Sequence, residues 1–202
     1  EILIGLVGSE MCIRDSTNAA LVAERFFGDC SPNSMLISIG RGVGAALCLN
    51  DVIIEGSSFT AGEIAHVVVD PNGPICECGK QGCLESFVSG DRLQQRISQD
   101  PAARTHILTE AGALLGRVMA IPAGLLDLRD ISVYGAPEIV NTQFIDAMEN
   151  EISRTVTTDY QEAPQIHRCR QGEDLTLRGQ ATIVIRTLVP TIHERGSLIG
   201  EA

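Results

Sequence analysis

The strongest constraint on this chain is a set of metal-binding residue types within a glycine-rich segment. Its members are His66, Cys76, Cys78 and Cys83. Zn²⁺ prefers four soft or borderline ligands in a tetrahedron, and three thiolates with one imidazole satisfy it. Gly79 and Gly82 allow the tight turns that return the last cysteine to the metal. The alternative is three free thiols in a loop with an unrelated histidine, but free cysteines are seldom clustered around glycines. Because four protein ligands leave no open position, we expect a structural zinc ion.

The remaining cysteines and histidines show no such clustering. The cysteines are Cys12, Cys30, Cys48 and Cys169, and the histidines are His106, His167 and His193. An odd total of seven cysteines, with one tight cluster and no recognisable export signal, favours reduced thiols in the cytoplasm over a disulfide framework. We expect Cys30, Cys48 and Cys169 to be small apolar fillers and the three histidines to lie at the surface or at helix ends.

Composition narrows the class of protein. Hydrophobic residues make up 44% and aromatic residues only 3% of the 202 positions, so the core must be built from Ala, Val, Ile and Leu. A net charge of −11 argues against direct binding of nucleic acid, although an acidic effector domain of a larger DNA-binding protein stays open. We find no apolar run of the roughly 20 residues that span a bilayer, so no membrane contact is expected.

Hydrophobic periodicity predicts an initial β-hairpin followed by alternating strands and helices, the pattern of an α/β fold. Strands are predicted at Met35–Ile39, Ala45–Leu49, Val52–Glu55, Val67–Val69, Ile131–Tyr134 and Gln165–Cys169. Helices are predicted at Asn18–Phe27, with Asn18 as N-cap, Cys83–Val88, Arg92–Ser98, His106–Leu128, Thr142–Thr155 and Leu177–His193. Pro122 is expected to kink or split the long helix, and Pro190 to disturb the last one.

The first segment, residues 1–16, reads EILIGLVGSEMCIRDS and resembles translated sequencing-adapter read-through. We therefore expect it to be non-native and leave it out of the fold prediction. The alternative is a genuine strand at Ile2–Val7 followed by a loop. On the first interpretation, native sequence begins near Thr17 and the segment upstream is missing.

The run Gly62–Glu85, GEIAHVVVDPNGPICECGKQGCLE, resembles the signature of the ROK family of repressors and sugar kinases. That signature joins Gly-Glu-Ile-Gly-His, Asp-Pro-x-Gly and Cys-x-Cys-Gly-x-x-Gly-Cys-x-Glu, and Ala65 is the one departure inside it. The resemblance covers roughly Thr17–Arg195 and implies an actin-like, RNase H-like fold with two lobes around a sugar cleft. Residues 17–202 would then be a sugar-binding fragment, essentially the C-terminal lobe, without the family's first phosphate-binding loop.

By resemblance, Glu63, His66 and Glu85 should contact sugar hydroxyls. A carboxylate accepts hydrogen bonds from neighbouring hydroxyls, and a histidine can bind zinc through one nitrogen and offer the other. Without the motif, each glutamate would be read as a solvated surface residue. Asn18 closes the segment that aligns with the kinases' Asn-Asp-x-Asn motif and is also expected at the substrate site.

Kinases of this family use the Asp of that motif as general base, but here Asp15 and Ser16 occupy the first two positions. Ser16 stands at the base position, and serine is no base near neutral pH. The second phosphate loop, usually Gly-Thr-Gly-Val-Gly, reads Gly-Arg-Gly-Val-Gly, with Gly40, Arg41, Gly42 and Gly44 as candidate phosphate contacts. Its amides could hold an anion, but a hairpin turn with a solvent-facing arginine is the simpler interpretation. A later nucleotide-side Gly-Gly is altered to Gly135-Ala136-Pro137.

These departures favour sugar sensing without phosphorylation, the property of the family's repressors. We expect an effector domain of a ROK transcriptional regulator of carbohydrate metabolism that binds a sugar or sugar phosphate. It would reach DNA only through a missing N-terminal domain and would form a homodimer or homotetramer. The alternative is a truncated ATP-dependent hexose kinase of the glucokinase or fructokinase type, which would need ATP and Mg²⁺. A third reading is a zinc-stapled oligomerisation module without a ligand.

Overall fold

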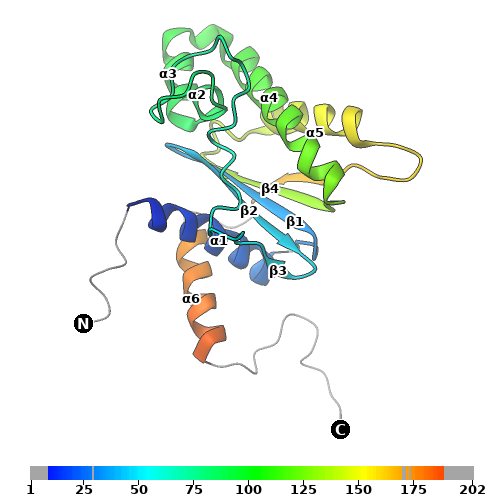
Figure 1. The fold of residues 1–202 in the computed structure, drawn as a ribbon. Coiled ribbons are helices and arrows are strands. Elements are labelled where there is room, and N and C mark those ends of the chain that lie inside the picture. The colour runs from blue at the N-terminus through cyan, green and yellow to red at the C-terminus, as the bar shows by residue number, and fades with distance from the viewer. Residues whose placement is uncertain (1–8, 29, 170–171, 173, 189–202) are drawn as a thin grey trace.

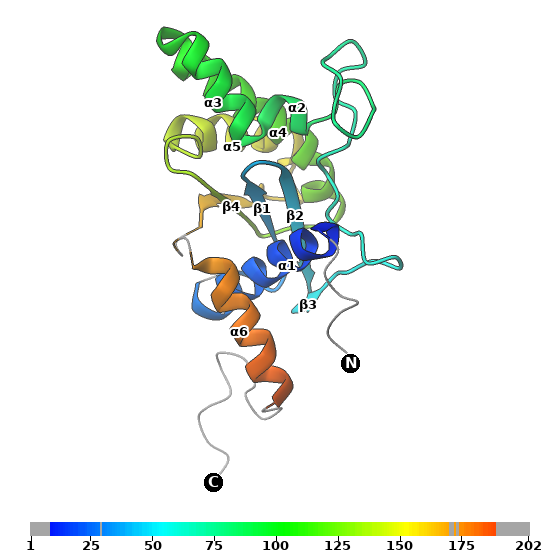
Figure 2. The ribbon, with the colours of Figure 1, turned by 90° about the vertical axis from the view of Figure 1, so that its left-hand side faces the viewer.

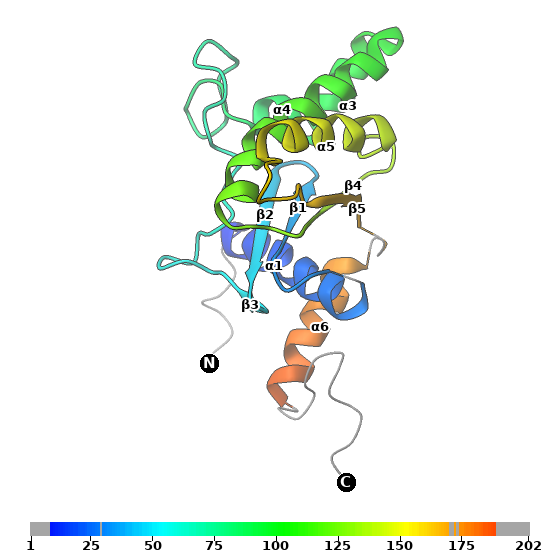
Figure 3. The same ribbon diagram turned by 90° about the vertical axis from the view of Figure 1, so that its right-hand side faces the viewer.

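A single mixed β-sheet organises the computed structural model, which describes residues 9–28, 30–169, 172 and 174–188. The strand order is β3-β2-β1-β4-β5 (Figures 1 and 3). The central strand β1 (Ser34–Ile39) pairs antiparallel with β2 (Val43–Leu49) and parallel with β4 (Asp130–Gly135). The edges are β3 (Val52–Ile53), antiparallel to β2, and β5 (Gln165–Arg168), parallel to β4. The α/β class predicted from the sequence is confirmed.

Helices cover both faces of the sheet. Figure 3 shows α4 (Arg104–Leu125) and α5 (Thr142–Val156) on one side and α1 (Ser9–Phe27) and α6 (Leu175–Leu188) on the other. The short helices α2 (Glu85–Val88), α3 (Gly90–Gln99) and η1 (Pro101–Ala103) lead into α4 (Figure 2). Side chains alternate along β1 because successive residues of a strand point to opposite faces. Met35 and Ile37 thus join the core under α4 and α5, and Leu36 joins the smaller core under α1.

Close approach of backbones holds the helical layers together. A Cβ at Gly112 of α4 would lie 2.2 Å from the carbonyl oxygen of Phe144 in α5. On the other face, a Cβ at Gly179 of α6 would lie 1.7 Å from the carbonyl oxygen of Ala19 in α1. Both helix pairs can therefore pack backbone to backbone only where glycine stands.

Helix α4 is also the apolar centre of the larger core. Among the described residues, Pro101–Leu125 is one helical stretch long and apolar enough to cross a membrane, and half of its most apolar window is buried inside the protein. Ile107, Leu108 and Leu115 belong to the buried cluster that packs on the sheet. The stretch therefore has the packing of a core helix.

Several predicted boundaries differ from the structure. Asn18 lies inside α1, which begins at Ser9, so the predicted N-cap is wrong. The predicted strand Val67–Val69 is wrong. Val68 makes only an isolated bridge to Cys83, because this segment pairs with its own loop instead of with the sheet. Pro122 sits inside an unbroken α4, three residues before the helix ends. The third strand stops at Ile53 instead of Glu55.

Other predictions fall outside the described residues. They are the alternative strand Ile2–Val7, Pro190 and His193. The last helix runs over Leu175–Leu188 and so begins two residues before its predicted start at Leu177.

A matched pair of substitutions in α4 tests the backbone contact with α5. Gly112→Ala should lower the free energy of unfolding by about 1–3 kcal/mol, because its methyl group meets a carbonyl oxygen. Gly124→Ala should instead raise it by about 0.5–1 kcal/mol, since its Cβ would lie 3.7 Å from a Val156 methyl group and alanine favours helix. Urea unfolding of the three proteins measures both changes. Equal effects of the two substitutions would contradict the packing described here.

Candidate metal and sugar site

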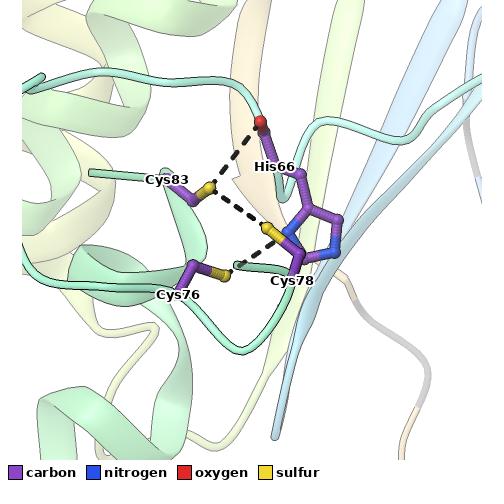
Figure 4. A group of neighbouring side chains, drawn as sticks. All are labelled: His66, Cys76, Cys78 and Cys83. Carbon is purple, nitrogen blue, oxygen red and sulfur yellow. Dashed lines mark hydrogen bonds between the residues drawn. The ribbon is translucent and has the colours of Figure 1, made fainter. Parts of the chain in front are cut away.

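The predicted metal ligands come together in the loop before α2. The ligand atoms of His66, Cys76, Cys78 and Cys83 all lie within 4.8 Å of one another (Figure 4). Cys76 Sγ is 3.6 Å from His66 Nδ1, and Cys78 Sγ is 3.6 Å from Cys83 Sγ. A tetrahedral zinc ion with Zn–S near 2.3 Å and Zn–N near 2.0 Å requires ligand atoms about 3.5–3.8 Å apart. The donor set and its spacing therefore fit zinc.

Backbone contacts shape the loop around these side chains. Isolated bridges join Val68 to Cys83 and Ile75 to Gln81, so the chain doubles back twice. Gly82 has φ +76°, and a Cβ there would lie 1.5 Å from the Asp70 carbonyl oxygen. The glycine is therefore required both by its conformation and by the approach of the backbone.

The thiols differ in their surroundings. Burial, followed by hydrogen bonding with the Cys78 and Cys76 thiols, raises the pKa of Cys83 to about 11. A backbone hydrogen bond at Lys80 lowers the pKa of Cys78, which is exposed. A cation beside these thiols would favour their thiolate forms.

The loop places Glu85 against the glycine turn between β1 and β2. One Glu85 carboxylate oxygen accepts a hydrogen bond from the Val43 N–H at 3.2 Å. A Cβ at Gly42 would lie 2.8 Å from the same oxygen. The Gly90 N–H donates to the Gly40 carbonyl oxygen at 2.7 Å. Glu85, which is predicted to bind a sugar, is thus in direct contact with the predicted phosphate loop.

Glu63 and His66 lie at the start of the cysteine loop, close to where the loop is tied to β2. The Ala45 N–H of β2 donates to the Gly62 carbonyl oxygen at 3.0 Å, which ties the loop to the sheet. Glu63 is exposed next to this contact, and His66 is half-buried. His66 turns Nδ1 toward Cys76, so Nε2 remains as the nitrogen available to a ligand (Figure 4).

The segment that we align with the family's Asn-Asp-x-Asn motif lies beside the glycine turn as well. A Cβ at Gly44 would lie 3.2 Å from the Thr17 hydroxyl, so this part of α1 packs on the start of β2. Ser16 and Asn18 flank Thr17 and are both half-buried. The side chain of Asp15 lies outside the described ones.

The glycine turn after β1 and the loop after β4 lie at one edge of the sheet. In the parallel pairing of β1 with β4, Ile39 is the partner of Gly135. The glycine turn with the exposed Arg41 and the loop with the exposed Ala136 and Pro137 therefore leave the sheet side by side.

Sequence reasoning missed a second cluster. Glu24, Cys30 and His167 place their ligand atoms within 4.8 Å of one another. His167 is half-buried on β5, which corrects its prediction as a surface or helix-end residue, and Cys30 lies near polar groups rather than in apolar packing. Cys48 and Cys169 are buried in the smaller core as predicted, but the Arg25 guanidinium also donates a hydrogen bond to Cys48 Sγ. The alternation of polar residues along β4 was the signal that could have indicated this cluster.

Two glycines of the loop provide a test of its geometry. Gly79 and Gly82 both have positive φ, but only a Cβ at Gly82 would collide with the backbone, since nothing lies within 4 Å of one at Gly79. Gly82→Ala should therefore abolish zinc retention, whereas Gly79→Ala should keep it at a strain cost of about 1–2 kcal/mol. Zinc content after dialysis, together with thermal unfolding, measures both. Retention of zinc by Gly82→Ala would refute the loop geometry.

Curated relatives match this chain over part of its length. An N-acetylmannosamine kinase of Yersinia pestis is 28% identical over 140 residues, which cover 61% of this chain and 48% of the kinase. The chain thus spans about half the length of the curated relatives it matches.

Solved structures share the fold. A ROK family transcriptional regulator, a homolog of the E. coli MLC protein, has a TM-score of 0.73 at 23% identity, covering 83% of this chain and 50% of the regulator. A ROK family glucokinase from Streptomyces griseus, in complex with glucose and AMPPNP, has a TM-score of 0.72 at 22% identity, covering 83% and 66%. The expected actin-like ATPase fold is confirmed. Because the ROK family profile also matches residues 5–187, this chain belongs to the ROK family.

Proposed function

We propose that residues 17–202 form the zinc-stapled, sugar-binding effector domain of a cytoplasmic ROK transcriptional regulator of carbohydrate metabolism. The observation that carries the proposal is the contact of Glu85 with the glycine turn, two residues after the metal-ligand candidate Cys83. In this view zinc would hold His66 and Glu85 in place before a sugar arrives. The chain would correspond to a C-terminal lobe, and residues 1–16 would be non-native.

The chemistry of the site suits a sugar or sugar phosphate. Glu63 and Glu85 can accept hydrogen bonds from adjacent hydroxyls, and such charge-assisted bonds are strong. His66 can add a third polar contact through Nε2, its tautomer set by a metal at Nδ1. Asn18 would approach from α1, whose neighbouring residue Thr17 packs on the glycine turn.

Three departures support sensing over phosphorylation. Ser16 stands where the kinases carry their catalytic aspartate, and a serine hydroxyl does not act as a base near neutral pH. Arg41 replaces the threonine of the phosphate loop. Ala136-Pro137 follows Gly135 where a second glycine is usual, and proline has no N–H to offer a nucleotide.

The second candidate function is a hexose kinase, of which this chain would be one lobe. The named kinases among the relatives favour it. So does the convergence of Gly40–Gly44 and Gly135 at one sheet edge, where backbone amides could hold phosphate groups. ATP and Mg²⁺ would then be required, and the base would have to come from native residues replaced by the segment 1–16.

The native upstream reading frame separates the two candidates. A basic helix-turn-helix would support the regulator, which would reach DNA through that domain and act as a homodimer or homotetramer. An Asp-x-Gly-Gly-Thr loop would support the kinase. A zinc-loaded protein that binds no sugar would instead favour an oligomerisation module.

Removal of one thiol tests the zinc staple, by which we mean the proposed zinc site of His66, Cys76, Cys78 and Cys83. Cys83→Ser should lose one equivalent of zinc per chain and unfold at a lower temperature, because binding to the folded state contributes to stability. Cys169→Ala, which removes a buried thiol outside the cluster, should keep that equivalent. Elemental analysis with thermal unfolding measures both. Unchanged zinc content in Cys83→Ser would exclude the proposed staple.

Charge removal at Glu85 tests the sugar site. Calorimetric titration with glucose and with N-acetylmannosamine should show at least one binding event, which Glu85→Gln weakens about 10-fold or more, since a hydrogen bond to a charged group contributes about 1.5–3 kcal/mol. Glu77→Gln removes the same charge from an exposed position in the same loop and should leave affinity unchanged. Equal affinity in all three proteins would remove Glu85 from the site.

A further inference from the structure

The sheet face under α1 is unusually polar near its β4 edge. Along β4, Ile131 and Val133 point into the larger core, so Asp130 and Ser132 point to the opposite face. These two residues are only 6% and 0% exposed. Buried polar side chains need partners, so this region calls for a physical explanation.

Three metal-binding residue types meet on that face. Glu24 comes from α1, Cys30 from the segment after it, and His167 from β5, with their ligand atoms within 4.8 Å of one another. The Ser132 hydroxyl lies between two of them, 3.4 Å from Cys30 Sγ and 3.0 Å from His167 Nε2.

An unpaired carboxylate oxygen lies next to this cluster. Asp130 Oδ2 accepts a hydrogen bond from the Ser31 N–H at 2.7 Å. Its Oδ1 is buried and has no hydrogen-bond partner within the part of the chain that the structure describes. Asp130 lines a cavity of about 440 Å³ together with Glu24, Ser31 and His167. A buried oxygen of this kind costs free energy unless a cation or water satisfies it.

Burial and acidic groups raise the pKa values of the thiols in this region. Burial, with added repulsion from Asp130 and Glu24, raises the pKa of Cys30 to about 12. Burial and the same Glu24 also raise the pKa of Cys169 nearby. Arg129 lies at the cavity wall but is exposed to solvent.

We propose that Glu24, Cys30 and His167 form a second metal site, which takes a divalent transition-metal ion of the zinc type. A carboxylate, a thiolate and an imidazole are the donors such ions prefer, and hard ions such as Mg²⁺ would not select the thiol. Three protein ligands leave a coordination position open toward the cavity and Asp130. The inference does not depend on the proposed function.

This proposed second metal site and the zinc staple lie at different ends of β4. Asp130 begins β4, whereas the glycine turn and Gly135 lie at the carboxyl ends of β1 and β4. An ion here would join the end of α1 to the edge strand β5, which pairs with β4 alone among the described strands. It would therefore stabilise an edge strand that backbone pairing holds on one side alone.

Metal stoichiometry of the full chain tests the proposal. After dialysis against zinc and then buffer, the parent chain should retain two equivalents, and the double variant Cys30→Ser/His167→Gln should retain one. Both substitutions change half-buried side chains to near-isosteric ones, so the fold should survive, as circular dichroism will check. His106→Gln, at an exposed position on α4, should keep two equivalents.

Cobalt provides a second readout. With zinc in the staple, added Co²⁺ should give the sulfur-to-metal charge-transfer band of a single thiolate, absent in the double variant. Zinc should also raise the unfolding temperature of the parent chain more than that of the double variant. Identical stoichiometry and cobalt spectra in the parent and the double variant would reduce the cluster to a buried hydrogen-bond network and overturn the proposal.

Discussion

The convergence of three thiols and one imidazole governs the loop on which the candidate site depends. Residues 54–84 join β3 to α2 and contain only isolated bridges, so this long segment lacks the ladder of backbone hydrogen bonds that shapes the sheet. Loops of this length without secondary structure are uncommon and usually functional. A tetrahedral metal cross-link through these four side chains would supply the order that the backbone alone does not. Glu85 follows directly, and its N–H donates to the Ala65 carbonyl oxygen of the same loop at 2.9 Å.

The sheet supplies the second half of the site. Parallel β1 and β4 end at the same edge, which places the glycine turn beside the loop after Gly135. The hydrogen bond between Val43 and Glu85 then joins this edge to the cysteine loop. A ligand bound at Glu85 would compete for this bond and so act on the turn. Such a differential contact is what a sensor needs in order to couple ligand binding to a change elsewhere.

The two faces of the sheet serve different purposes. Under α4 and α5 the face is apolar, and glycines let the helix backbones approach closely. Under α1 an apolar patch around Leu36 gives way to buried polar groups toward β5. The alternation of side chains along β4 produces this contrast, since one strand serves both faces.

The sequence by itself determined the α/β class and the clustering of His66, Cys76, Cys78 and Cys83, because residue type, spacing and glycines encode a local loop. It misplaced the start of α1 at Asn18 and a strand at Val67–Val69, where local propensity competes with packing and loop closure. Only the tertiary structure decided that Glu85 contacts the glycine turn. It also decided that the ligand atoms of Glu24, Cys30 and His167 lie close together. Those contacts join residues far apart in the chain, and strand order and helix placement, rather than spacing, decide which of them become neighbours.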